Sequence, residues 1–451
     1  MTDTPLQGQP GQTGHPNSLY ALGSLTRRRN AAESRFKIYG IAAICLSLGT
    51  LFIMLFTIFS DGISSFRQAS LTFPVTLSAD QLDEDGNRNP DEMASVTTIG
   101  YGNLLRDNFV AHMLAQGIST EGLDDSDIGD LISRDAAAQL RDQVLSNPDL
   151  IGSTIEVSVL AAGRIDGYIK GRVTMETALL DSNIMPEQLV LADQLLEKGI
   201  LTAAFNWAFL TSPDASDQRP EAAGLGVAII GSAYMMLMVL VMSLPIGVAA
   251  SIYLEEFAPK NRWTDLIEVN ISNLAAVPSI VFGILGLAIF INFAGLPQSS
   301  SIVGALVLTL MTLPTIIIAT RASLKAVPPS IRDAALGVGA SRMQTVFHHV
   351  LPLAMPGILT GTILGLATAL GETAPLLLIG MVAFVDNYPS APIAGFFDPA
   401  TALPVQVYGW AQRSDPAFVE RSAGAIIVLL GFLLMMNIVA IILRRRFERR
   451  W

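Results

Sequence analysis

Glu372 is the first residue whose chemistry stands out, because its carboxylate lies inside a long apolar run. A charged side chain within a membrane costs about 3 kcal/mol or more unless it is paired or faces water. Thr373 follows it directly, and Thr368 lies one turn before it. This placement predicts a polar site on a path across the membrane. The alternative is a structural carboxylate whose oxygens are satisfied by neighbouring helices.

A second group of candidate residues lies in the polar segment 321–357. It comprises a carboxylate, two alanines, a glycine and a Leu-Pro pair: Asp333, Ala334, Ala335, Gly339, Leu351 and Pro352. Ser330 is placed to cap a first helix, Gly339 to reverse the chain, and Pro352 to end a second helix. The pattern predicts a helix–turn–helix outside the membrane. An interfacial connector between two spans is the alternative.

Enzyme chemistry finds little support in the remaining residues. The sequence contains no G-x-x-x-x-G-K-[ST] phosphate loop, no G-x-S-x-G elbow and no H-E-x-x-H helix. Its one cysteine, Cys45, and its four scattered histidines do not form a metal-binding pattern. We therefore expect neither a metal nor a cofactor, and any energy for uphill work must come from a partner.

The elements that position these residues are membrane spans. Hydrophobic residues make up 51% of the 451-residue chain and charged residues only 15%, against about 25% charged in soluble proteins. This composition excludes a disordered or nucleic-acid-binding protein. Residues 38–59 contain no charge and are long enough to cross a bilayer. Five more spans are predicted at about 226–254, 274–293, 302–320, 358–382 and 423–443.

Lys and Arg residues set the predicted orientation. The N-terminal tail, the loop 255–273, the segment 321–357 and the C-terminal cluster together carry 16 of them. The opposite loops hold only Arg413 and Arg421. By the positive-inside rule, both termini face the cytoplasm.

Residues 60–225 form an acidic block on the other side of the membrane. They contain 26 Asp and Glu against 10 Lys and Arg, so the block has a net charge of −16 within a chain of net charge −11. Helical spacing is predicted for 127–146 and 186–205, and alternation predicts a strand at 154–160. The predicted fold class is therefore an all-α polytopic membrane protein with six transmembrane helices and an inserted soluble α+β domain.

The cytoplasmic segment resembles the coupling loop of bacterial ABC importer permeases. That family shows Glu-Ala-Ala, then Gly, then Ile-x-Leu-Pro, and this chain differs in having Asp333 for Glu and His349 for Ile. The stretch Gly371-Glu-Thr-Ala-Pro-Leu-Leu377 resembles the corresponding motif of the PstA-type permease subunit of phosphate importers. The large block after the first span is similar to the longer PstA-type proteins, which carry an extra N-terminal extracytoplasmic domain.

The resemblance, together with composition, hydropathy and charge, implies five parts. These are a disordered cytoplasmic tail (1–37), a first transmembrane helix (38–59), the acidic extracytoplasmic domain (60–225), a permease domain (226–443) with its coupling loop at 321–357, and a basic cytoplasmic tail (444–451). It further implies a location in the bacterial inner membrane and assembly with a homologous permease subunit, cytoplasmic ATPase subunits and an extracytoplasmic phosphate-binding protein. Compact members often carry an arginine where this chain has Thr368, and another near Arg321, so both join Glu372 and Thr373 as candidates for the translocation path.

Small residues recur every four positions on the helix before Glu372, at Gly357, Gly361 and Gly365. Such a ridge permits close packing against a neighbouring span or against the partner permease. Two alternatives to a phosphate permease stay open. One is an importer for another oxyanion or small solute. The other is a membrane-anchored sensor with an external receptor domain, which would need a cytoplasmic output domain.

Overall fold

The computed structural model describes residues 24–83, 86–89, 93–381, 384–391 and 393–447. The first helix, α1, spans Ser24–Gly62 and begins well before the predicted residue 38. Residues 24–37 are therefore not the disordered tail that we predicted. Good helix formers and an ion pair between Glu33 and Lys37, 2.6 Å apart and one turn from each other, extend the helix. Residues 1–23 and 448–451 of the two predicted tails lie outside the described residues.

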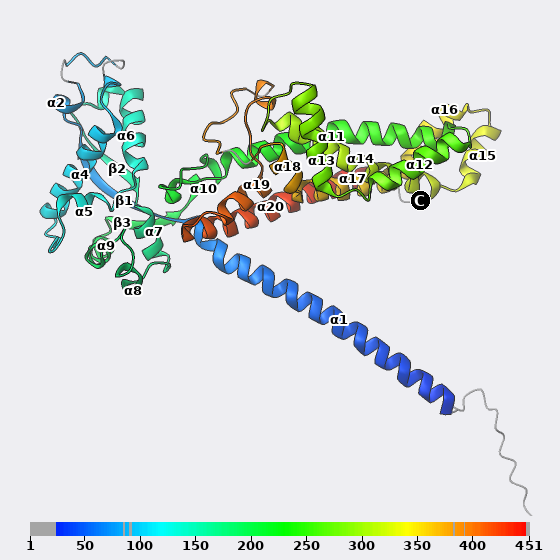
Figure 1. Cartoon of the computed structure of the whole chain (residues 1–451), viewed down its shortest axis with the longest axis horizontal. Helices are drawn as coiled ribbons and strands as arrows, with labels where there is room; N and C mark the ends of the chain where they lie inside the picture. The colour runs from blue at the N-terminus through cyan, green and yellow to red at the C-terminus, as the bar shows by residue number, and fades with distance from the viewer. Residues whose placement is uncertain (1–23, 84–85, 90–92, 382–383, 392, 448–451) are drawn as a thin grey trace, which may run out of the picture. The chain divides into compact units, whose positions relative to one another are not determined.

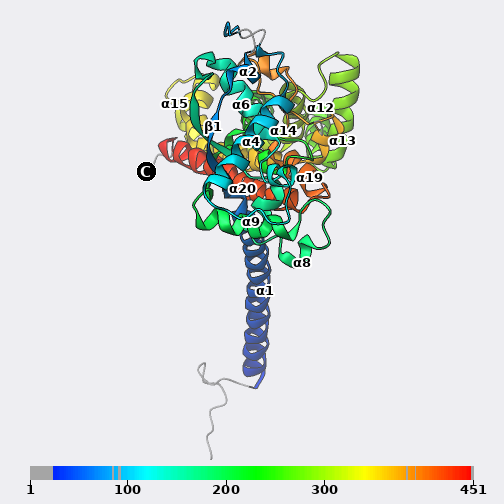
Figure 2. The same cartoon turned by 90° about the vertical axis from the view of Figure 1, so that its left-hand side faces the viewer.

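The block after α1 contains a three-stranded antiparallel sheet in the order β2-β1-β3. The strands are β1 (Arg67–Thr76), β2 (Thr154–Leu160) and β3 (Leu201–Phe205), with Leu71 opposite both Val159 and Leu201. Alternate residues of β1 are buried, as the period of two requires. Helices α4 (Thr98–Ala115) and α6 (Asp135–Ser146) lie beside the sheet (Figures 1 and 2). The predicted α+β class is confirmed.

The helical predictions for this domain were wrong in part. Strand β2 has the predicted bounds, but the helix predicted at 186–205 ends at Glu197 as α9 (Pro186–Glu197). Gly199, at φ +72°, then turns the chain into β3. The pattern at 127–146 is divided between α5 (Asp125–Gly129) and α6, because Ile132 pairs with Ala161 at the sheet edge. The shorter helices are α2 (Ala79–Leu82), α7 (Gly163–Ile169), α8 (Met175–Ala178) and α10 (Trp207–Thr211).

Long apolar helices make up the second half of the chain. They are α11 (Gly226–Ile252), α14 (Ser301–Lys325), α17 (Leu351–Gly371) and α20 (Pro416–Phe447). These helices pack against one another around a core that includes Val303, Val307, Leu366 and Ala369 (Figure 1). The described residues contain five helices long and apolar enough to cross a membrane, and a sixth if one bent pair counts as one span.

The bent pair corrects the span predicted at 274–293. Helix α12 (Arg262–Leu274) occupies what was predicted to be a loop, and α13 (Ser279–Gly286), with its π-helical continuation Leu287–Phe293, follows at 102° to it. Pro278 lies at the break, where its missing N–H and fixed φ favour a change of direction. A hydropathy pattern indicates that a stretch is apolar, but it does not indicate where the helix bends.

The span predicted at 358–382 is also interrupted. Helix α17 stops at Gly371, and a separate short helix, α18 (Ala374–Leu378), follows. Helix α19 (Leu403–Ala411) then lies between this region and α20 and packs against α20.

Candidate functional site

The break between α17 and α18 contains Glu372. Its backbone is extended, with φ −83° and ψ 122°, so the helix is unwound at the carboxylate. Its side chain is half-buried, and among the described residues no hydrogen bond or ion pair reaches its carboxylate. Thr373 is half-buried beside it, whereas the Thr368 hydroxyl donates to Leu364 of its own helix at 3.0 Å. An acidic group at an interrupted helix is suited to contact a polar solute.

A second chain segment packs against α18, the short helix that follows the break. Helix α13 packs against α18, and a Cβ added at Gly283 would lie 2.7 Å from the Pro375 Cα. Beyond α18, the Ser299 hydroxyl donates to the Gly380 carbonyl at 2.5 Å. Gly380 has φ +92°, a conformation that favours glycine. The bent α12–α13 pair therefore fixes the short helix that follows Glu372.

The glycine ridge of α17 faces α14 of the same chain. A Cβ added at Gly361 would overlap the Ala319 Cβ, and one added at Gly357 would overlap the Ser323 side chain. Gly365 approaches Ile316 at ordinary van der Waals distance. Of the two packing partners that the sequence left open, the structure places these glycines against the neighbouring span.

The polar segment forms a helix–turn–helix, which we call the knob (residues 329–352). Helix α15 (Pro329–Gly337) carries Asp333 and Ala334 on its exposed side, while Ala335 is buried. Gly339 has φ +91°, which confirms the predicted reversal. At the tip of the knob, Val338 is 86% exposed. The knob therefore presents Asp333 and the apolar Val338 to solvent beside a turn fixed by Gly339.

Two details of the knob differ from the prediction. Ser330 makes no cap, because Pro328 and not Ser330 is the residue before the first helical turn. Pro352 does not end the second helix, since α16 (Arg342–Thr345), a π-helical turn at Val346–Val350 and α17 form one helix from Arg342 to Gly371. Pro352 has no backbone N–H to donate to the preceding turn. The wider π turn before it, with its different hydrogen-bond spacing, is compatible with that missing bond. Leu351 and Pro352 thus join the knob directly to the helix that ends at Glu372.

Arg332 ties the knob to the membrane helices, and our sequence reasoning missed it. Its Nη2 lies 2.6 Å from Oε1 of Glu256, in the π-helical end of α11 (Tyr253–Phe257). The same guanidinium donates to the carbonyl of Leu324, in the last turn of α14, at 2.9 Å, and to that of Val327, just after α14, at 2.8 Å. One side chain therefore links three elements. An acidic residue at the end of a predicted span and an arginine beside the motif were the available signals.

Arg321 belongs to a neighbouring ion-pair cluster. Its Nη2 lies 2.5 Å from Glu268 of α12, and its Nε lies 3.4 Å from Glu255. It follows Ala319 on α14, and Ala319 faces Gly361, whereas Glu372 lies past the other end of α17. Arg321 and Glu372 therefore lie at different levels along α17, and their membership of one path stays a prediction. Two carboxylates neutralise Arg321 where α12 and α14 meet.

Comparisons with known proteins agree with this architecture. Residues 243–451 match the family described as the binding-protein-dependent transport system inner membrane component, and residues 24–178 match a domain of unknown function (DUF3333). A probable ABC transporter permease protein of Bacillus subtilis is 33% identical over 221 residues, covering 46% of this chain and 74% of the relative. A phosphate transport system permease protein of Mycobacterium tuberculosis is 32% identical over 250 residues, covering 55% and 79%.

A further relative and one solved structure were also found. A phosphate transport system permease protein of Xylella fastidiosa is 32% identical over 215 residues, covering 48% of this chain and 72% of the relative. An inward-facing structure of a methionine ABC transporter covers 49% of this chain and 97% of its own, at 16% identity and a TM-score of 0.39. The family assignment depends on the sequence relatives.

Proposed function

Because this chain belongs to the family of ABC importer permeases that includes the PstA proteins, we propose that it is a permease subunit of an importer for inorganic phosphate. The observation that carries the proposal is the knob. Its Asp333 and Ala334 are exposed, its chain turns at Gly339, and its second helix runs unbroken from Arg342 to Gly371, directly before Glu372. Phosphate as the solute is supported by what the relatives in Mycobacterium tuberculosis and Xylella fastidiosa are named for.

The energy for transport comes, in this proposal, from partner subunits that hydrolyse ATP. The knob docks on a cytoplasmic ATPase through its exposed Asp333 and Val338, and nucleotide-driven closure of the ATPases moves it. Arg332 passes that movement to α11 and α14, and α17 passes it to the break at Glu372. A homologous permease completes the path, and an external binding protein delivers phosphate to it.

The path itself passes the interrupted helix at Glu372 and Thr373, with Thr368 one turn away. Phosphate is an anion, so a carboxylate beside it would act through a cation that the path also carries. The basic groups that phosphate needs come from the partner permease, because Arg321 is already paired with Glu255 and Glu268.

The orientation follows from the distribution of basic residues. Sixteen Lys and Arg lie on the proposed cytoplasmic side, which includes the knob and both termini. Residues 60–225 then lie outside the inner membrane of the bacterium, between the first span and the permease domain 226–443. The sheet and helices of this region support the proposal that it is a separate domain.

Replacing Gly339 by valine tests the proposal. Valine at φ +91° is strained by about 1–3 kcal/mol, so the turn of the knob is distorted while the membrane helices are untouched. We expect the complex to assemble and phosphate uptake to be abolished in cells that depend on this importer. Gly337→Val is the matched control, because a Cβ there meets no neighbour and its φ is not positive. Normal uptake by the Gly339 variant would refute the coupling role.

A further inference from the structure

Arg421, near the outer end of α20, forms hydrogen bonds with both chain segments that connect the extracytoplasmic domain to the membrane helices. Its side chain is buried, and Nη1 donates to the Ala223 carbonyl at 2.6 Å while Nη2 donates to the Glu221 carbonyl at 2.7 Å. These residues lead from the domain into α11. Nη2 also donates to Oε1 of Gln68 at 3.2 Å, at the start of β1 where the chain enters the domain. The segment that enters the domain and the segment that leaves it are thus bound by one guanidinium group.

Glu420, the preceding residue of α20, is bound by the body of the domain. Lys170 lies 3.1 Å from its Oε1, and Arg172 forms an ion pair with its Oε2. Asp166 of α7 completes the cluster, 2.7 Å from Lys170, and it accepts the N–H of Ala69 in β1 at 3.0 Å. The Glu420, Asp166 and Lys170 side chains are all at least 94% buried.

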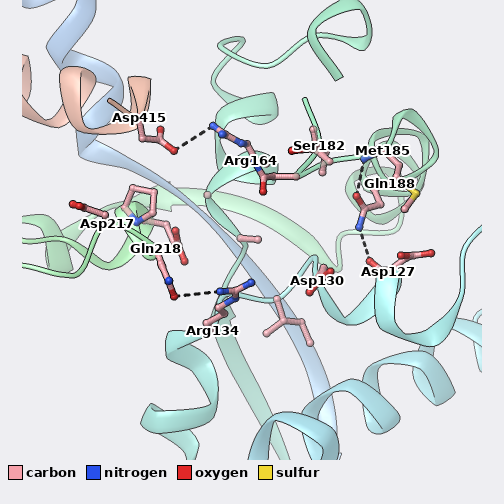
Figure 3. Close-up of a pocket in the computed structure, with 17 residues that line it drawn as sticks. Asp127, Asp130, Arg134, Arg164, Ser182, Met185, Gln188, Asp217, Gln218 and Asp415 are labelled. Atoms are coloured by element: carbon pink, nitrogen blue, oxygen red, sulfur yellow. Dashed lines mark hydrogen bonds and ion pairs between the residues drawn. The ribbon is translucent and has the colours of Figure 1, made fainter. Parts of the chain in front are cut away.

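Two partly exposed ion pairs surround this buried cluster. Arg164 of the domain lies 3.3 Å from Asp415, just before α20, on the wall of a polar cavity of about 530 Å³. Figure 3 shows this ion pair among the residues that line the cavity. Arg413, which follows α19, lies 2.9 Å from Asp214 in the segment leading to α11. Arg413 and Arg421 are the two basic residues that the sequence count assigned to the short outer loops, and both lie in this junction.

Buried ion pairs resist separation. Removing one partner leaves the other charge in a poorly solvated site, and several such charges would have to separate together if the domain turned on its connections. Excising residues 62–222 would likewise leave Glu420 without Lys170 and Arg172. The charged residues at the outer end of α20 therefore depend on the domain for their partners.

We propose that Glu420 and Arg421 are positioning residues that lock the extracytoplasmic domain to α20, so that the domain and α20 move as one body during transport. The extracytoplasmic domain is then a fixed outer wall of the permease and not a module that moves on a flexible linker. This inference does not depend on phosphate being the solute.

Distance measurements in the assembled transporter test the proposal. Spin labels at Leu180, 90% exposed in the domain, and at Val419, 53% exposed beside the junction, report the separation of the two bodies. We expect the same distance distribution without nucleotide and with ATP trapped by vanadate. A shift of the mean distance by several ångströms between the two states would overturn the inference.

A conservative variant gives a second, independent measurement. In Arg421→Lys the charge stays, but one ammonium cannot reach Gln68, Glu221 and Ala223 together. We expect amide hydrogen exchange at residues 68–69 and 222–224 to accelerate about tenfold. Arg219→Gln, which removes a partly exposed pair with Asp135 in the same connection, is the control and should leave this exchange within about twofold of the unaltered protein. Unchanged exchange in the lysine variant would contradict the lock.

Discussion

The link between Arg332 and Glu256 yields the sharpest prediction about coupling. Arg332→Gln removes a charged pair whose side chains are only 22% and 11% exposed, and it leaves the Glu256 carboxylate with no other ion-pair partner among the described residues. Breaking a fully buried pair costs about 3–5 kcal/mol. Partial exposure reduces this, so we expect a loss of about 2 kcal/mol in docking the knob, which is about 30-fold in the equilibrium.

The assay is the ratio of phosphate transported to ATP hydrolysed in the assembled importer. We expect Arg332→Gln to lower this ratio strongly while ATP hydrolysis continues, because the knob still meets the ATPase but no longer moves α11 and α14 with it. Combining it with Glu256→Gln should cost less than the sum of the single changes, since the unpaired carboxylate is then gone. Lys325→Gln, at a 58% exposed side chain in the same segment, is the control. Additive costs, or an unchanged ratio, would refute the reasoning.

Three further predictions concern single side chains. Glu372→Gln should lower uptake severalfold without loss of the protein from the membrane, as measured by uptake and immunoblot, and unaffected uptake would make it a structural carboxylate. Gly361→Ala should destabilise the permease by about 1–3 kcal/mol, because the added methyl group would overlap Ala319. Gly431→Ala, whose methyl group would meet no neighbour, should not destabilise it. Equal melting temperatures for the two variants would contradict this prediction. Burial raises the pKa of the Glu221 carboxyl above its ordinary 4.5. The free energy of unfolding of the unaltered protein, relative to that of Glu221→Gln, should therefore fall as pH rises from 4.5 through the raised pKa. A difference between the two proteins that does not change with pH would be the contrary result.

Local patterns in the sequence predicted local structure well. The alternation at Thr154–Leu160 fixed β2 to the residue, and the Gly339 turn followed from a backbone that only glycine adopts readily. The knob was predicted for the same reason, since its two helices and its turn depend on neighbours in the chain. Its attachment through Arg332 was not predicted, because Glu256 lies 76 residues away.

Interruptions and long-range pairs were beyond local reasoning. The break at Glu372 and the bend at Pro278 leave hydropathy unchanged, so both regions were predicted as straight spans. The role of Arg421 depends on Gln68 and Glu221, which only the fold brings together. The count of basic residues set Arg413 and Arg421 apart as exceptions, and that count was the one sequence signal for the junction.

ATP-dependent accumulation of radiolabelled phosphate in proteoliposomes containing the assembled importer tests the central claim most directly. We predict accumulation that requires ATP inside the vesicle and the binding protein outside it, and that is lost with Gly339→Val but kept with Gly337→Val. Accumulation of another oxyanion with no accumulation of phosphate, or phosphate entry that is independent of ATP, would contradict the account.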